Sequence, residues 1–429
     1  MSPVALFLFF MIAVLLALPI STTLGLTAIL PRILDSTFPA SPEMVIRAML
    51  AGVDSFPILA VPMFILSGII MARGGISKKL FNVFTYFIGN KTAGLPMAVV
   101  MTCLFYGAIS GSGPATAAAV GSMTIPLLVN LGYDKVFSTA LVAVAGGLGV
   151  IIPPSIPFIF YGMASGASVG ALFIAGVLPG LLIGACLMGY AYFYCKKKGE
   201  DKEKIMANYN ALRSQGFITV FKESFWALLA PIIILGSIYS GVASPTEAAV
   251  ISVYYAFFVS LFIYKSLKFN QIIKIFTEGV ATYAPILFII AAALGFARVL
   301  TLMQVPQAIA MAITATFTSK VAVLIIINVF LLLVGMVMDT TPAILILTPI
   351  LLPIVTAFGV DPVHFGVIMV VNLAIGFVTP PIGINLFVTS SFTGVPVADI
   401  AKQAMPFIFM FIVALIFITF VPAISLALL

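Results

Sequence analysis

Residues 147–157 read GLGVIIPPSIP, which places two adjacent prolines inside an otherwise apolar segment. Proline has no backbone N–H, and its ring collides with the preceding helical turn. Pro153 and Pro154 therefore cannot both continue a helix. The pair predicts a helix over about 136–166 that is broken in the middle of its hydrophobic run.

The composition places this break inside a membrane. Of the 429 residues, 62% are hydrophobic and only 8% are charged, whereas a soluble domain carries about 25% charged residues. Apolar runs of about 20 residues recur, which is typical of spanning helices rather than of β-barrel strands. We expect an all-α polytopic protein in the lipid bilayer of the bacterial inner membrane. The +7 charge is spread over short loops and indicates no nucleic-acid partner.

The polar residues do not favour an enzyme. His364 is the only histidine, and the three cysteines are scattered without a metal-ligand spacing. No nucleophile–base pair is apparent in the apolar runs. We therefore expect no catalytic residues.

The proline pair occurs twice. Residues 374–384 read AIGFVTPPIGI, and Pro380 follows Pro153 by 227 residues. Other turn and helix-breaking residues match at the same spacing: Gly149 with Gly376, Pro126 with Pro353, Gly132 with Gly359, Asp134 with Asp361, and Pro179 with Pro406. We interpret the chain as two repeats, 1–195 and 223–429, with a second broken helix at about 363–392.

A basic linker separates the repeats. Residues 196–222 hold seven of the twenty lysines and arginines, so the positive-inside rule predicts a cytoplasmic linker. The first ten and last twenty residues carry no charge. We expect both termini to be periplasmic, so that each half crosses the membrane an odd number of times. The two repeats are then inverted, which is a common plan for secondary transporters.

Each repeat also predicts a re-entrant helical hairpin. The first covers about 95–130, and its tip lies in the stretch FYGAISGSGPATAAAVGS. The second covers about 321–357, and its tip lies in VGMVMDTTPAILILTP. Single crossings are expected at 50–72 and 279–302, and an amphipathic helix at the membrane surface is expected at 266–278.

Broken helices inside a membrane suggest ion sites. Non-helical backbone is tolerated there only against protein or a water-filled cavity, and its freed carbonyls suit Na⁺. A simple proline kink is the alternative, but two breaks, each with its own hairpin, favour ion binding.

Ser155 beside the first break, Asp339 at the second tip and Arg298 at the end of an apolar span each allow a structural and a functional interpretation. Ser155 caps the next half-helix or contacts a ligand. Asp339 caps a helix, binds a cation, or does both. Arg298 pairs with an anionic substrate or extends to the membrane surface.

The stretches FYGAISGSGPATAAAVG, GGLGVIIPPSIPFIFYG, ASPTEAAV, MDTTPAILILTPILLP and NLAIGFVTPPIGINLF resemble the large membrane subunit of TRAP (tripartite ATP-independent periplasmic) transporters. The resemblance covers essentially the whole chain. It implies an elevator-type, Na⁺-coupled importer with scaffold and transport domains. It also implies a small four-helix membrane subunit, expected here as a separate chain, and a periplasmic substrate-binding protein. The implied substrate is an organic anion, with sialic acid favoured and a C4-dicarboxylate next.

The resemblance also implies which residues form the sites. The first of about two sodium sites would use Ser110, Ser112, Gly149 and Pro153. The second would use Gly335, Asp339, Thr341, Gly376 and Thr379. The substrate carboxylate would be bound by Ser110, Ser155 and Arg298.

A stand-alone divalent-anion/sodium symporter of similar architecture is the alternative function. That class typically shows Ser-Asn-Thr at its hairpin tips, whereas the tips here read SGSGPAT and DTTPA. Dependence on a binding protein distinguishes the two.

Overall fold

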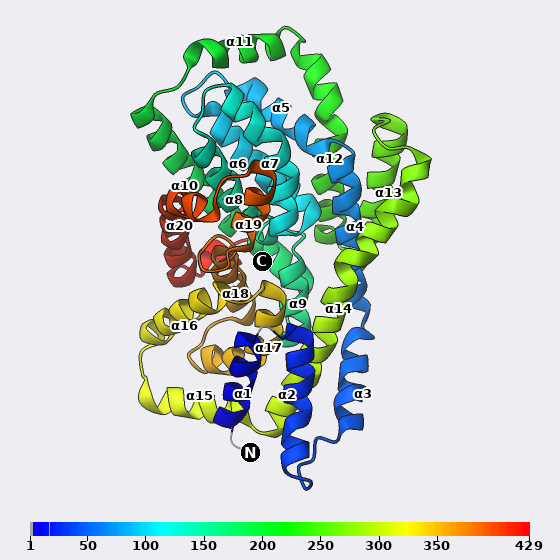
Figure 1. Ribbon diagram of the computed structural model, residues 1–429, viewed down its shortest axis with the longest axis vertical. Helices are drawn as coiled ribbons and strands as arrows, with labels where there is room; N and C mark the ends of the chain where they lie inside the picture. Colours follow the sequence, from blue (N-terminus) through cyan, green and yellow to red (C-terminus); the bar gives the residue numbers. More distant parts are fainter. Residues whose placement is uncertain (1–2, 17) are drawn as a thin grey trace.

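The computed structural model describes residues 3–16 and 18–429, and every regular element in this part of the chain is helical (Figure 1). The sequence also predicts a first crossing at about 4–17, which ends outside the described residues. Helix α1 (Pro3–Leu15) and helix α2 (Ile20–Leu34) have 13 and 15 residues. At 1.5 Å per residue each is about 20 Å long, which is shorter than a hydrocarbon core of about 30 Å.

Within the described residues, seven helical segments are long and apolar enough to cross a membrane. They are Phe56–Arg73, Val169–Lys198, Phe217–Tyr239, Pro245–Ile263, Phe269–Leu302, Thr340–Ala357 and Val397–Phe420. The chain is therefore an all-α polytopic membrane protein, as the sequence predicts.

The crossing expected at 50–72 starts later, at Phe56–Arg73, because the chain breaks before it. Helix α3 (Pro42–Val53) ends at Asp54, and a 3-10 turn, η1 (Phe56–Leu59), leads into α4 (Ala60–Arg73). Pro57 has no N–H to donate to the carbonyl four residues back, so α3 cannot continue through it.

The first hairpin and first broken helix follow one another directly. The elements, in order, are α5 (Ile76–Ile88), α6 (Gly94–Ser110), α7 (Gly113–Asn130), α8 (Lys135–Gly146), the 3-10 turn η2 (Gly147–Val150), α9 (Ile156–Ser165) and α10 (Val169–Lys198). The hairpin turn lies at 111–112 and the helix break at 147–155.

The basic linker contains a helix that the sequence analysis did not predict, α11 (Lys202–Arg213). Asp201 caps this helix by accepting the N–H of Lys204 at 3.2 Å. After it come α12 (Phe217–Tyr239) and α13 (Pro245–Phe258), which continues as a π-helix, η3 (Val259–Ile263).

The separate helix expected at 266–278 does not form. A short 3-10 turn, η4 (Phe269–Gln271), leads straight into α14 (Ile272–Leu302), so the crossing expected from 279 starts earlier. This helix has 31 residues and passes through Pro285. A helix that was not predicted, α15 (Val305–Thr316), follows it.

The second hairpin and second broken helix complete the chain. They are α16 (Lys320–Gly335), α17 (Thr340–Ala357), α18 (Pro362–Gly376), α19 (Ile384–Thr393), α20 (Val397–Phe420) and α21 (Ala423–Leu426). Helices α7 and α17 both have 18 residues and begin 227 residues apart.

In space, α11 lies at one end of the long axis of the molecule, and α15 lies at the other end with the start of the chain (Figure 1). The long helix α14 runs beside α3 and α4 along one side. Helix α10 packs against α20, so the last helices of the two halves meet. The division into two inverted repeats and the orientation in the membrane stay predictions.

Candidate functional site at the hairpin tips and helix breaks

The first hairpin tip is built from small residues that cap both helices. Helix α6 ends at Ser110, and Gly111 takes a positive φ of 61°, which glycine adopts at little cost. Ser112 is extended, and its hydroxyl accepts the N–H of Ala115 at 3.5 Å. The chain therefore reverses within two residues.

A hydroxyl cluster fills the inside of this tip. Thr116 Oγ1 donates to the carbonyl oxygen of Ser112 at 2.8 Å and lies 2.9 Å from Ser110 Oγ. The side chains of Ser110 and Thr116 are buried. Thr116 is thus central to the tip, although the sodium set predicted from sequence omitted it.

The tip packs directly on the first helix break. A Cβ on Gly149 would lie 2.4 Å from Thr116 Oγ1 and 2.7 Å from the carbonyl oxygen of Ser112. A Cβ on Gly107 would lie 2.7 Å from the Cα of Gly149. Only glycine permits these approaches. The structure therefore brings Ser110, Ser112 and Gly149 of the predicted first sodium set together.

The proline pair removes helix donors at this break. Pro153 and Pro154, joined by a cis peptide bond, offer no N–H to the carbonyls of residues 149 and 150. Ser155 Oγ donates to the carbonyl of Val150 at 2.5 Å and accepts the N–H of Phe158 at 3.3 Å. The capping role of Ser155 is confirmed, and its hydroxyl is fully buried.

The second tip carries a carboxylate. Asp339 Oδ1 accepts the N–H of Thr340 at 2.7 Å and starts α17, so its capping role is confirmed. Within the described residues no lysine, arginine or histidine forms an ion pair with Asp339. A carboxylate without a basic partner in an apolar segment is costly, which makes Asp339 a candidate functional residue.

The second tip also meets its helix break. A Cβ on Gly376 would lie 2.2 Å from the carbonyl oxygen of Gly335. The N–H of Ile382 donates to the carbonyl of Met336 at 3.3 Å. Thr379 Oγ1 donates to the carbonyl of Ile375 at 2.7 Å, so that hydroxyl is engaged within the break.

Thr341 and Gly376, of the predicted second sodium set, lie in the helices that flank this contact. Thr341 is buried in the first turn of α17. The Gly376 carbonyl accepts the N–H of Thr379 at 3.2 Å, which closes the end of α18. The second sodium set therefore lies on one hairpin tip and one helix break.

The two breaks lie next to each other. Asn385 Nδ2 donates to the carbonyl of Ala143 at 2.9 Å, and so joins α19 to α8. A Cβ on Gly113 would lie 3.1 Å from the ring of Phe377. Asn385 Oδ1 is buried and has no hydrogen-bond partner among the described residues. The sequence analysis missed this amide, although it stands out as the one polar residue in PPIGINLF.

Within the described residues, no hydrogen bond joins the three residues predicted to bind substrate. Arg298 is exposed on α14, and no hydrogen bond or ion pair to it occurs in the described part of the chain. Ser110 and Ser155 are buried on the hairpin and broken-helix side. Their role in substrate binding stays a prediction.

The donors at both tips are hydroxyls, backbone carbonyls and one carboxylate. The described residues hold no group of three or more histidine, cysteine, aspartate or glutamate side chains that could hold a metal ion. Oxygen donors of this kind fit a hard cation such as Na⁺, and they do not fit a zinc or copper centre.

Paired hairpins whose tips cover interrupted helices, inside a polytopic helical protein, define a secondary membrane transporter. The chain matches the family described as "Tripartite ATP-independent periplasmic transporter, DctM component" over residues 6–424. It belongs to this family.

Individual relatives of the chain are named as large permeases or permeases of TRAP transporters. The isethionate TRAP transporter permease protein DctMQ of Oleidesulfovibrio alaskensis is 43% identical over 98% of this chain, which spans only 65% of that relative. The C4-dicarboxylate large permease DctM of Pseudomonas aeruginosa is 41% identical over 95% of the chain and 93% of the relative. The sialic acid large permease SiaM of Vibrio cholerae is 35% identical over 89% and 88%.

A solved structure shows the same fold. The YdaH transporter of Alcanivorax borkumensis superposes with a TM-score of 0.64 at 15% identity, covering 96% of this chain and 97% of that one. At this identity the likeness supports the fold only.

Proposed function

We propose that the chain imports an organic anion coupled to Na⁺, as the large membrane subunit of a tripartite transporter. Its partners would be a small membrane subunit and a periplasmic substrate-binding protein. The observation that supports this proposal is that each hairpin tip packs on a helix break where a proline pair removes two N–H donors of a regular helix.

Two Na⁺ ions would be held between tip and break. In the first half, the hydroxyls of Ser110 and Thr116 and the carbonyls near Gly149 supply oxygens. In the second half, Asp339 supplies a charge as well as an oxygen. Since these donors come from both hairpin and broken helix, an ion between them would fix one against the other.

The moving unit would contain both hairpins and both broken helices. The contact of Gly113 with Phe377 and the bond from Asn385 to Ala143 tie the two breaks into one body. This body would move in an elevator manner against a scaffold of the outer spans, including α4, α13 and α14. Arg298 lies on the scaffold side, where a substrate anion could meet it.

The substrate stays a proposal at the level of an organic anion. The sequence resemblance favours sialic acid, with a C4-dicarboxylate next. Relatives named for isethionate and C4-dicarboxylates share 43% and 41% identity, compared with 35% for the sialic acid relative. A test must therefore offer all three anions.

Uptake into proteoliposomes tests the function. The chain, reconstituted with its small subunit, is offered each labelled anion with and without the binding protein and a Na⁺ gradient. We expect uptake of one anion that requires both additions. Equal uptake without Na⁺ would refute the coupling, and uptake without the binding protein would favour the stand-alone symporter.

A further inference from the structure

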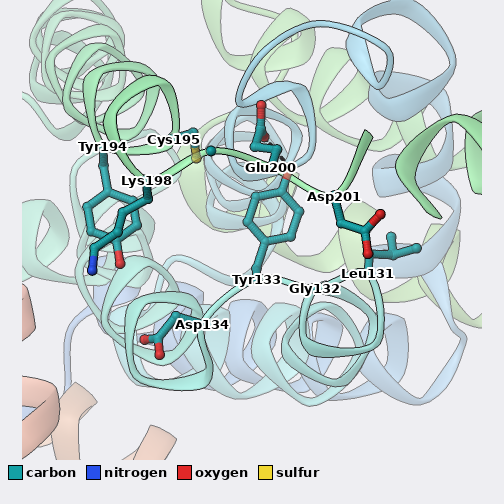
Figure 2. A pocket seen from close by; sticks show the side chains of 10 residues that line it. Leu131, Gly132, Tyr133, Asp134, Tyr194, Cys195, Lys198, Glu200 and Asp201 are labelled. Atoms are coloured by element: carbon teal, nitrogen blue, oxygen red, sulfur yellow. Dashed lines mark hydrogen bonds between the residues drawn. The ribbon is translucent and has the colours of Figure 1, made fainter. Parts of the chain in front are cut away.

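The linker begins beside the base of the first hairpin. Glu200 lies in the short turn between α10 and α11, next to Tyr133 in the turn between α7 and α8 (Figure 2). Its side chain is half-buried, although the linker around it is rich in exposed lysines. This carboxylate takes no part in the candidate ion sites described above.

Glu200 accepts hydrogen bonds from two directions. The backbone N–H of Ala93 donates to both carboxylate oxygens, at 3.1 Å and 3.0 Å. The hydroxyl of Tyr133 donates to Oε1 at 2.5 Å. We call this arrangement of Glu200, Ala93 and Tyr133 the Glu200 clasp.

The two donors belong to opposite arms of the hairpin. Ala93 directly precedes α6 with a φ of 57°, and it is fully buried. Tyr133 follows the end of α7 by three residues. The carboxylate therefore bridges both arms at the base of the hairpin, about 25 Å along α6 from the tip. The dipole of α6 also stabilises a negative charge near the start of this helix.

Both donors of the clasp, the N–H of Ala93 and the hydroxyl of Tyr133, depend on Glu200 as their acceptor. The buried N–H of Ala93 has Glu200 as its hydrogen-bond acceptor, and a buried N–H without an acceptor is costly. Burial, and then the hydrogen bond to Glu200, raise the pKa of Tyr133, so the phenol stays protonated and donates. A pocket of about 220 Å³ beside the clasp, lined in part by Cys195 and Asp201, leaves this site reachable from solvent.

The second hairpin closes its base without the linker. Lys320, at the start of α16, donates from Nζ to the carbonyl of Gly359 in the turn after α17, at 3.0 Å. Gly359 is the residue that matches Gly132 at the 227-residue spacing. The first hairpin obtains the corresponding bridge from Glu200, which lies outside the hairpin.

We propose that Glu200 is a positioning residue that holds the arms of the first hairpin together and makes the linker part of the moving body. The role of Glu200 in holding the hairpin together does not depend on the proposed function. We also expect loss of Glu200 to lower the affinity for Na⁺. This second effect rests on the proposed function, because it requires an ion site at the far end of the same hairpin.

Hydrogen exchange of the reconstituted protein with its small subunit tests the clasp. In Glu200→Ala we expect peptides covering the start of α6 to exchange about five- to tenfold faster, as expected for loss of a helix-capping acceptor. Glu200→Gln, which keeps one acceptor oxygen, and Tyr133→Phe should give smaller increases. Glu203→Ala is the matched control, because Glu203 is an exposed carboxylate of the same linker.

Na⁺ dependence of uptake is the second readout. We expect the Na⁺ concentration for half-maximal uptake to rise about two- to tenfold in Glu200→Ala and to stay unchanged in Glu203→Ala. Equal exchange at α6 in the two variants would overturn the clasp. Faster exchange with unchanged Na⁺ dependence would overturn its link to the tip. If uptake by the wild-type protein does not depend on Na⁺, the proposed function is refuted. Hydrogen exchange still shows whether Glu200 holds the arms of the hairpin together.

Discussion

A Cβ on Gly376 would lie 2.2 Å from the carbonyl oxygen of Gly335, so the backbones of α16 and α18 are in direct contact at this point. Gly335 ends the first arm of the second hairpin, and Gly376 ends the first half of the second broken helix. Helix α18 is buried from His364 to Gly376, and α16 packs one face against it. The contact fixes the position of the hairpin relative to the break.

Gly376→Ala should therefore separate the second tip from its break. Overpacking of a close contact costs about 1–3 kcal/mol, and here the added carbon meets backbone that cannot rotate away. We expect lower thermal stability and loss of uptake. Gly189→Ala on α10 is the control, since nothing lies within 4 Å of a Cβ there. Equal behaviour of the two variants would show that the close contact is unimportant.

The Thr116 hydroxyl should matter for Na⁺ beyond its contribution to stability. Thr116→Val keeps the shape and removes the hydroxyl that bonds the Ser112 carbonyl and approaches Ser110. We expect the Na⁺ concentration for half-maximal uptake to rise about tenfold, as for loss of one charge-assisted contact. Thr124→Val is the matched control, because that buried hydroxyl bonds only the Val120 carbonyl on the same helix. An equal Na⁺ response in both variants would contradict the prediction.

The helix breaks and hairpin turns could be located from sequence because proline and glycine leave a direct mark there. The first tip, for example, turns at Gly111 with positive φ. Other boundaries leave weaker marks. Pro57 ends α3, yet Pro285 lies inside the continuous helix α14. A proline alone does not decide between a break and a kink, because neighbouring helices can satisfy the freed carbonyl.

The oxygen atoms that form the candidate site could be predicted from sequence only in part. Gly149 and Gly376 could be placed at the breaks, but the carbonyls they expose have no residue signature. The bond from Asn385 to the carbonyl of Ala143 joins residues 242 apart, and no local pattern encodes it. The substrate residues depend on the position of the scaffold relative to the hairpins, which sequence does not specify.

Asp339 should carry a charge-dependent role beyond its cap. Asp339→Asn keeps an oxygen that accepts the N–H of Thr340, and it removes the negative charge. If the carboxylate binds a cation, the Na⁺ concentration for half-maximal uptake should rise at least about tenfold. The measurement is uptake against external Na⁺ at fixed substrate concentration.

The control for Asp339 is another helix cap. Asp361 accepts the N–H groups of Val363 and His364 at 2.8 and 3.1 Å, and it is exposed at the start of α18. Asp361→Asn removes a charge from a cap of the same kind. If both variants transport with unchanged Na⁺ dependence, Asp339 is only a cap.

Arg298 should act on the anion and leave the cation unaffected. The guanidinium is exposed on α14 without a hydrogen bond or ion pair in the part of the chain described, so it is available to a substrate carboxylate or sulfonate. Loss of one charge-assisted contact corresponds to about a ten- to hundredfold effect. In Arg298→Gln we expect KM for the anion to rise by about this factor, with the Na⁺ response unchanged. Arg47→Gln, an exposed arginine on α3, is the matched control. If KM is unchanged in both variants, Arg298 serves only to anchor α14 at the membrane surface.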